Sequence, residues 1–279
     1  MCILLFVGGC SQDEQEQVQD REPVRLVYVD WVSEQASAHV VKAVIQEEMG
    51  LDCELLTVSL HAMWQSLAAG EQDASVAAWL PSLQADFLQE YQGEIQELGV
   101  NLEGTRIGLV VPEYVEVESI EELSGHRDRF ENRILGIDPG AGIMARTSEA
   151  MNAYGLDGFE LISGSGPTMT TALEKAIEEE RWIVVTGWTP HWKFAKWDLR
   201  YLDDPDGVYG QEEHISTIAR QGLEDDMPEV FSFLQNFYWS PEDMEQVMLW
   251  ARDEQMDYYQ AAKRWVMENQ DRVQAWLEN

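Results

Sequence analysis

The sequence predicts an α/β fold of two lobes, with two crossover strands and a ligand cleft between the lobes. Apolar β-branched runs alternate with stretches of helical periodicity, a pattern typical of mainly parallel sheets. The alternation restarts near residue 119, and residues 225–278 read largely as helices. Two series joined near 105–113 and again near 198–205 therefore indicate two lobes, the first closed by the C-terminal helices. Two-lobed binding proteins of this plan hinge around a ligand in the cleft.

The first series begins at Val24, with a strand that ends in a strand–helix loop at Asp30-Trp31. Gly50 and Gly70 each follow a helical stretch, as expected at helix C-termini, and Pro81 ends a strand. These signals predict further strands at 51–58, 75–80 and 105–111, and helices at 33–49, 61–69 and 87–93.

The second series begins with a short helix that has Ser119 as its N-cap residue and Glu122 in a capping box. Gly155 closes a later helix of this series. We expect strands at 134–138, 159–163, 182–185 and 198–202, helices at 143–154 and 168–180, and C-terminal helices at 225–236, 240–252, 255–268 and 269–278. The expected lobes are residues 23–108 with 204–279, and residues 109–203.

Three tryptophans lie where predicted strands end. The run Trp182–Val185 indicates a strand buried on both faces, and Trp188 follows where the chain leaves the sheet. Trp31 and Trp79 hold equivalent positions in the first series. Ligands bind at the carboxyl ends of strands in open α/β sheets, so the three rings are expected to face the cleft. The alternative for Trp31 and Trp79 is that each caps its strand, and the further tryptophans of this stretch are interpreted as core: Trp182, Trp192 and Trp197.

The charge of the chain limits its partners. With 52 acidic and 18 basic residues, the net charge is −34, which argues against nucleic acid and anionic lipid surfaces. Such a surface repels itself at low salt and is relieved by screening. We therefore hypothesise an environment of high salt, with a merely acidic secreted protein as the alternative.

The first ten residues, M-C-I-L-L-F-V-G-G-C, resemble the end of a bacterial lipoprotein signal peptide. Cys10 would be the lipidated residue, and residues 11–22 are polar enough to act as a tether. This predicts an extracytoplasmic protein anchored to a membrane through Cys10. Cys53 would then be the remaining thiol, expected to pack as a small apolar residue, and no Cys/His cluster indicates a metal.

Five motifs, in order along residues 24–279, resemble the substrate-binding proteins of osmoprotectant ABC transporters of the glycine betaine type. They are D-W-V-S-E-Q-A-S at 30–37, A-A-W-L-P from 78, G-L-V-V-P-E-Y-V at 108–115, G-I-D-P-G-A-G-I-M at 136–144 and V-T-G-W-T-P-H-W-K-F-A-K-W-D-L at 185–199. The resemblance implies a periplasmic-binding-protein fold that closes on its ligand and presents it to a membrane permease.

The chemistry of such a ligand agrees with the tryptophans. A trimethylammonium group is positive but has no N–H donor, and aromatic faces bind it at about 0.5–2 kcal/mol per contact. The resemblance places Trp31, Trp79 and Trp188 in an aromatic cage. We therefore expect these three rings to surround the cation.

The resemblance also assigns donors to the ligand's carboxylate. It places the carboxylate on the backbone of Gly142 and Ile143, where a Gly-rich turn opens a helix and its free N–H groups face an anion. Close relatives have a His shortly after the W-L-P; this chain has Gln84, whose amide donates without a charge. His191 is interpreted as a residue at the edge of the cleft or behind its first layer.

Other functions remain open at this point. The ligand could be choline, carnitine, proline betaine or dimethylsulfoniopropionate. An extracytoplasmic enzyme is the rival class, but the chain has no G-x-S-x-G elbow, H-E-x-x-H or P-loop. The S-G-S-G-P stretch at 163–167 has no obvious His or acid partner and is expected to be a loop. No cofactor is expected.

Overall fold

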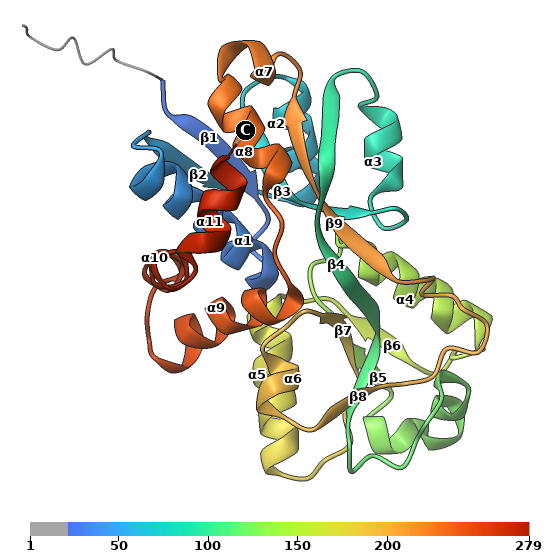
Figure 1. The fold of residues 1–279 in the computed structure, drawn as a ribbon. Helices are drawn as coiled ribbons and strands as arrows, with labels where there is room; N and C mark the ends of the chain where they lie inside the picture. The colour runs from blue at the N-terminus through green and yellow to red at the C-terminus, as the bar shows by residue number, and fades with distance from the viewer. Residues whose placement is uncertain (1–21, 279) are drawn as a thin grey trace, which may run out of the picture.

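The computed structural model describes residues 22–278, which form two α/β bodies joined by one long strand and by the returning segment at 202–212 (Figure 1). That strand, β4 (Ile95–Pro112), runs through both bodies and pairs with different neighbours along its length. The expected lipidation site Cys10, and the tether up to residue 21, lie outside the described residues. The two-lobed α/β fold expected from the sequence is confirmed.

The first body is built on β2 (Cys53–Thr57), β1 (Val24–Tyr28), β3 (Ala74–Leu80), β9 (Glu213–Arg220) and the first part of β4. β1 pairs parallel with β2 and β3, whereas β9 is antiparallel to both β3 and β4. Helices α1 (Val32–Ala43), α2 (Leu60–Ala68) and α3 (Ala85–Glu90) belong to this body, and a π-helical turn, η1 (Val44–Glu48), extends α1.

The second body is built on β7 (Val185–Thr189), β5 (Arg133–Leu135), β6 (Glu160–Ile162), β8 (Leu199–Tyr201) and the last part of β4. β4 is antiparallel to β7 and β8, and β5 is parallel to β6 and β7. Its helices are η2 (Ile120–Phe130, a 3₁₀-helix), α4 (Gly142–Ala153), α5 (Gly166–Glu178) and α6 (Lys193–Lys196).

Two strand predictions are wrong in their bounds, and one strand was not predicted. The strand expected at 182–185 is β7, which begins at Val185, so Trp188 lies inside a strand and not beyond its end. β4 begins ten residues before the expected 105, and β9 was not expected at all. Because β9 and β4 run antiparallel to their neighbours, the sheet is mixed where a mainly parallel one was expected.

The C-terminal helices cover the first body. α7 (Leu223–Asp226) and α8 (Pro228–Asn236) replace the single helix expected at 225–236, because Pro228 lacks the N–H that would continue α7. They are followed by α9 (Pro241–Asp253), α10 (Tyr258–Glu268) and α11 (Gln270–Leu277). An aromatic cluster holds these helices together and includes Trp265 stacked on Trp276 at 5.6 Å between ring centroids.

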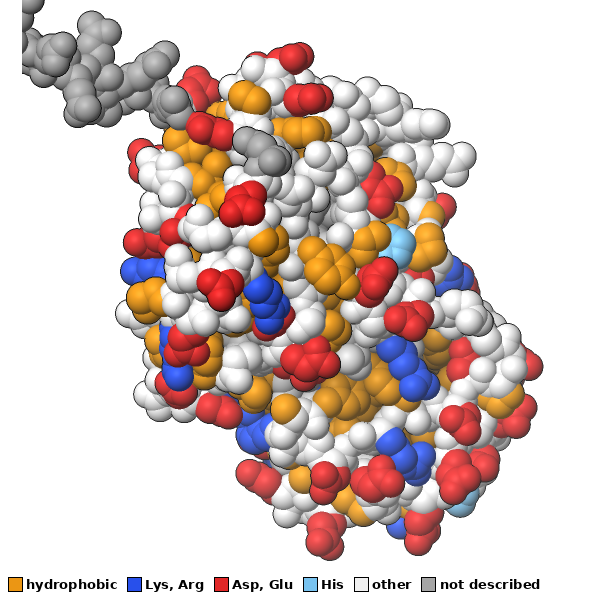
Figure 2. All heavy atoms as spheres, in the orientation of Figure 1, with side chains coloured by type: hydrophobic (Ala, Val, Ile, Leu, Met, Phe, Trp, Pro, Cys, Tyr) orange, Lys and Arg blue, Asp and Glu red, His pale blue; other side chains and the backbone are white. Residues whose placement is uncertain are grey.

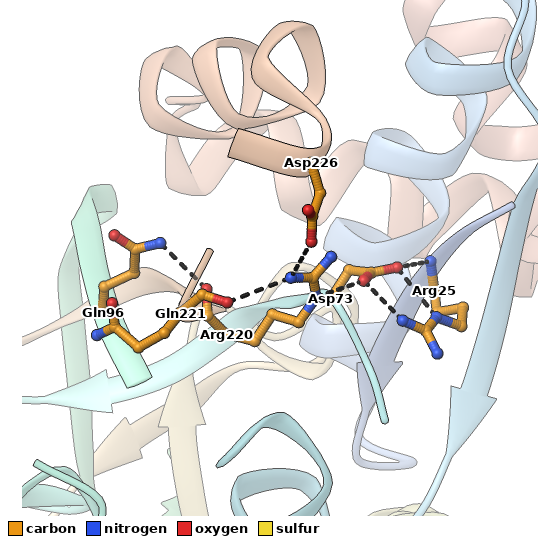
Figure 3. Close-up of polar contacts among 6 residues, drawn as sticks. All are labelled: Arg25, Asp73, Gln96, Arg220, Gln221 and Asp226. Atoms are coloured by element: carbon orange, nitrogen blue, oxygen red, sulfur yellow. Dashed lines mark hydrogen bonds and ion pairs between the residues drawn. The ribbon is translucent and has the colours of Figure 1, made fainter. Parts of the chain in front are cut away.

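A buried carboxylate joins the ends of β1, β3 and β9 to α7 (Figure 3). Asp73 is fully buried and accepts hydrogen bonds from the backbone N–H of Arg25 at 2.8 Å, from the Arg25 guanidinium at 3.0 Å and from Arg220 at 2.8 Å. Arg220 also pairs with Asp226 at 2.8 Å. Burial by itself would raise the pKa of Asp73, but the bonds from the two arginines outweigh it and lower that pKa.

Acidic side chains are spread over both bodies on the face that Figure 2 shows. Cys53 is buried as expected, and burial raises the pKa of its thiol to about 12. Within residues 22–278, no helix has the length and apolar character needed to cross a membrane.

Candidate functional site

A pocket lies where the two bodies meet and contains about 370 Å³ of space free of protein atoms, part of it open to solvent. Most of its wall is apolar, and side chains from β1–α1, β3–α3, β5–α4 and β7 all reach it. Its lining residues are Trp31, Trp79, Leu83, Gln84, Ile107, Ile137, Ala141, Gly142, Ile143 and Trp188. The structure thus brings six of the seven expected ligand-binding residues together and leaves out His191.

The three lining tryptophans come from three separate elements. Trp31 is the N-cap residue of α1 and lies in the expected loop after β1. Trp79 is the penultimate residue of β3, and Trp188 lies inside β7, opposite Ile107 of β4. All three rings are buried and border the same cavity, so a group placed there is enclosed by aromatic faces or edges.

Two carboxyl groups contact the rings from outside the pocket. The indole N–H of Trp31 donates to Asp138 at 3.3 Å, a bond from the first body to the second. Glu34 of α1 is fully buried, accepts from the backbone N–H of Val29 at 3.0 Å, and lies near the indole N–H of Trp79 without forming a well-aligned bond to it. Burial raises the pKa of Glu34 well above its usual range, which favours the neutral form of this carboxyl.

The wall behind Trp188 contains two buried basic side chains. The His191 ring contacts Trp188 edge to face at 4.7 Å, and its Nδ1 accepts from the backbone N–H of Lys193 at 3.0 Å. The Lys193 Nζ lies 4.4 Å from the centre of the Trp188 ring and has no hydrogen-bond partner among the described residues. Burial lowers the pKa of both side chains well below their usual values, and the neighbouring cations add to this for His191.

Hydrogen-bond donors line another part of the pocket. Gly142 and Ile143 are the first two residues of α4, where backbone N–H groups have no partner within the helix. A Cβ at Gly142 would lie 3.1 Å from the backbone oxygen of Leu83, so a glycine allows this close approach of the two bodies. Gln84, the N-cap residue of α3, is buried, and its Oε1 accepts from the Trp64 indole N–H at 3.0 Å.

Sequence reasoning missed the residues that support the pocket. Glu34, Trp64 and Asp138 contact its lining residues from elsewhere in the fold, and only the three-dimensional structure shows these contacts. Lys193 gave one usable signal, because it is a lone cation in the aromatic stretch W-T-P-H-W-K-F. Within the described residues, no group of three or more His, Cys, Asp or Glu side chains could hold a metal ion.

A family model described as the substrate-binding domain of an ABC-type glycine betaine transport system matches residues 22–268. The glycine betaine/carnitine transport binding protein GbuC of Listeria monocytogenes is 49% identical over 147 residues, which is 52% of this chain. The match spans only about half, 49%, of that relative's own length.

Two solved structures are similar over 92% of the chain. Lactococcal OpuAC, closed on glycine betaine, is 40% identical with a TM-score of 0.87, and all of that chain is covered. The glycine betaine/L-proline-binding protein ProX of Borrelia burgdorferi is 37% identical with a TM-score of 0.88 and 97% coverage. These are binding proteins and not enzymes. The chain therefore belongs to the family of substrate-binding domains of ABC-type glycine betaine transport systems.

Proposed function

We propose that this protein captures glycine betaine, or a close betaine, outside the cytoplasm and delivers it to the permease of an ABC importer for osmoprotection. The observation that carries the proposal is one pocket with three tryptophans and, beside them, the N-terminus of α4. The first suits a quaternary ammonium and the second suits a carboxylate. Glycine betaine joins these two groups by a single methylene.

The cation is assigned to Trp31, Trp79 and Trp188. A trimethylammonium group cannot donate a hydrogen bond, so it gains little from polar side chains and is attracted to the faces of aromatic rings. The lining includes no acidic side chain that would favour a hydrogen-bonding ammonium instead. The cage therefore selects for the methylated cation over a primary amine.

The carboxylate is assigned to Gly142, Ile143 and Gln84. Two unpaired N–H groups and the positive end of the α4 dipole stabilise an anion at this point. Gln84 contributes an uncharged donor in place of the His of close relatives. This end of the site has no titratable side chain.

Binding is expected to close the two lobes, taken as residues 23–108 with 204–279 and residues 109–203. Trp31 and Trp79 come from the first body, whereas Trp188, Gly142 and Ile143 come from the second, so only a closed molecule completes the ligand's contacts. Small-angle scattering is expected to show a smaller radius of gyration with ligand. An unchanged profile at saturation would remove the hinge from the mechanism.

The protein is expected to be anchored to a membrane through a lipid on Cys10, with residues 11–22 as the tether. Expression in a bacterial host followed by fractionation tests this. The parent protein should stay with the membrane and Cys10→Ala should be soluble. Equal partitioning of the two would contradict the anchor.

A longer betaine such as carnitine is the second candidate. A neighbouring cavity of about 690 Å³, part of it open to solvent, shares Trp31 and Trp188 with the pocket and is also lined by Arg252 and Tyr258, so a longer ligand would extend to that side. The name of the Listeria relative includes carnitine as well as glycine betaine.

Calorimetric titration against a panel decides between these ligands. Glycine betaine, carnitine, proline betaine, dimethylsulfoniopropionate and choline are each titrated into the purified protein. We expect glycine betaine to bind most tightly, and choline, which has no carboxylate, to bind at least about tenfold more weakly. Failure of all five to bind would refute the proposed function, and tightest binding of choline would refute the assignment of the carboxylate.

A further inference from the structure

We infer that Trp64 is a positioning residue that holds the Gln84 amide with its N–H₂ group toward the pocket and thereby makes the site select a carboxylate over an alcohol. The inference rests on the proposed function and adds to it a residue outside the pocket lining. The evidence for it is the hydrogen bond between the Trp64 and Gln84 side chains, the burial of both, and the fact that an indole N–H can only donate.

Both partners are fixed in place. Trp64 lies on α2, is completely buried, and stacks on Phe87 with 5.8 Å between ring centroids and 12° between ring planes. The Gln84 side chain is also buried, and its backbone N–H donates to the carbonyl of Trp79, a cage residue, at 3.0 Å. The Trp64 Nε1 then donates to the Gln84 Oε1 at 3.0 Å.

This bond determines which end of the amide faces the ligand. An indole N–H is only a donor, so it must bond to the amide oxygen and not to the nitrogen. The N–H₂ end of Gln84 is left without that partner, and because Gln84 lines the pocket, this end is the one available to a ligand. Without Trp64, the amide could rotate and present its oxygen, which repels a carboxylate.

The orientation of the Gln84 amide affects the binding of betaine and of choline differently. A carboxylate is acceptor-only when ionised and needs a donor, whereas the hydroxyl of choline both donates and accepts and can bond to either end of an amide. Fixing the N–H₂ end toward the pocket therefore strengthens binding of betaine more than binding of choline. The ratio of the two affinities reports the orientation, and a general loosening of the fold would weaken both.

Trp64→Phe is the main variant, because it keeps the ring that stacks on Phe87 and removes the N–H. Trp239→Phe is the matched control: Trp239 is equally buried, and its indole N–H has no partner within the described part of the chain. Both variants lose one N–H from a buried ring, but only the first touches Gln84.

The experiment is calorimetric titration of glycine betaine and choline into the parent protein, both variants, Gln84→Ala and the double variant Trp64→Phe/Gln84→Ala. We expect Trp64→Phe to lower betaine affinity about five- to tenfold and to change choline affinity by less than about twofold. Trp239→Phe should match the parent for both ligands. On the Gln84→Ala background, Trp64→Phe should have no further effect on betaine.

Gln84→Glu gives a second test that leaves Trp64 untouched, in case Trp64→Phe does not fold. One carboxylate oxygen can still accept from Trp64, and the other replaces the N–H₂ group in the pocket. Betaine affinity should fall by about 30-fold or more and choline affinity should rise. Unchanged betaine binding by this variant would overturn the inference.

Further outcomes separate this inference from the proposed function. If the parent binds betaine but Trp64→Phe binds it equally well, or loses betaine and choline affinity in the same proportion, the positioning role is wrong and the function stands. The same holds if the loss persists on the Gln84→Ala background. If the parent does not bind betaine at all, both are wrong.

Discussion

Asp73 and Lys193 are both fully buried ionisable side chains, but only Asp73 has hydrogen-bond partners among the described residues. Asp73, just before β3 in the first sheet, accepts bonds from two guanidinium groups and a backbone N–H. Lys193, behind the pocket wall, has a buried Nζ with no hydrogen-bond partner in residues 22–278 and faces the rings of Trp188 at 4.4 Å and Phe194 at 5.2 Å. The carboxylate is kept charged, whereas the amine is driven toward its neutral form.

The difference shows where this fold tolerates unfavourable burial. Near Asp73 the polar groups are paired and stabilise the first body. Next to the three tryptophans, by contrast, Lys193, Glu34 and Trp79 each have a polar atom with no hydrogen-bond partner among the described residues. Under the proposed function, a neutral Lys193 would leave the Trp188 ring available to the ligand's cation. A charged Lys193 would occupy that ring from behind and repel the ligand. The unpaired groups thus lie next to the proposed ligand pocket.

The largest expected effect is on the stability of the first body. Asp73→Ala leaves two arginines without their shared partner and should lower the free energy of unfolding by about 3–5 kcal/mol, with betaine affinity unchanged. Because the pKa of Asp73 is lowered in the folded state, its contribution is present above the ordinary Asp pKa near about 4 and is lost as pH falls through the folded pKa. Urea unfolding at pH 7 and pH 3 measures both effects.

Asp128→Ala, at an exposed ion pair, is the control and should change the free energy of unfolding by less than about 0.5 kcal/mol.

The next effect is on the pocket. Trp188→Ala should lower betaine affinity by about 2 kcal/mol, or about 30-fold, because a desolvated ring that faces the cation is lost. Trp188→Phe should lose less. Calorimetry measures both, with Trp250→Ala as a control, because the Trp250 ring lies against Arg264 on the C-terminal helices and not in the pocket. Parent-like binding by Trp188→Ala would show that the cage is misassigned.

Lys193→Met should have the opposite sign to Asp73→Ala and raise the free energy of unfolding by about 1–3 kcal/mol at pH 7. The folded-state pKa of Lys193 is lowered, so the unfolded chain binds the proton more strongly. Stability of the parent should therefore rise with pH up to about 10.4, and the variant should lose that part of the slope. Urea unfolding from pH 7 to 10 tests this, and a destabilised Lys193→Met would contradict the account of an unpaired amine.

The smallest effect concerns contacts between the bodies. The Arg252 guanidinium of α9 lies 3.8 Å from the centre of the Trp192 ring and 3.7 Å from Glu174 of α5, contacts that favour the closed arrangement. Arg252→Met should weaken betaine binding about threefold at low salt and less at high salt. Arg264→Met is matched, because Arg264 lies 4.0 Å from the Trp250 ring and pairs with Glu268 inside α10. Equal effects of the two variants would rule out a closing role for Arg252.

Local signals in the sequence were sufficient to predict where much of the candidate site lies. Trp31 and Trp79 were expected at strand ends because Pro81 and the restart of helical periodicity mark those ends, and the structure places both there. The start of α4 was expected from the Gly-rich turn, and the helix begins at Gly142. Such features depend on neighbouring residues alone.

Features that depend on distant residues could not be predicted. β9 was missed because Ser216 and Thr217 read as polar, yet both are buried and bond to Glu97 and Asn101 of β4. The early part of β4 contains a register shift next to Gly99 and shows no continuous apolar run. β7 begins late because its pairing with β5 starts at Leu135, whose partner is Val185 and whose N–H donates to the Val184 carbonyl; residues 182 and 183 are buried but lie outside this ladder.

The most direct test of the two-ended site is to change only the charge of the ligand. The carbon isostere 3,3-dimethylbutanoate keeps the carboxylate and the shape of glycine betaine but replaces the quaternary nitrogen with carbon. Three ring contacts with a cation predict that it binds about 100-fold more weakly than betaine in calorimetric competition, at constant pH and salt. Equal binding of the two compounds would show that Trp31, Trp79 and Trp188 form an apolar pocket and not a cation cage.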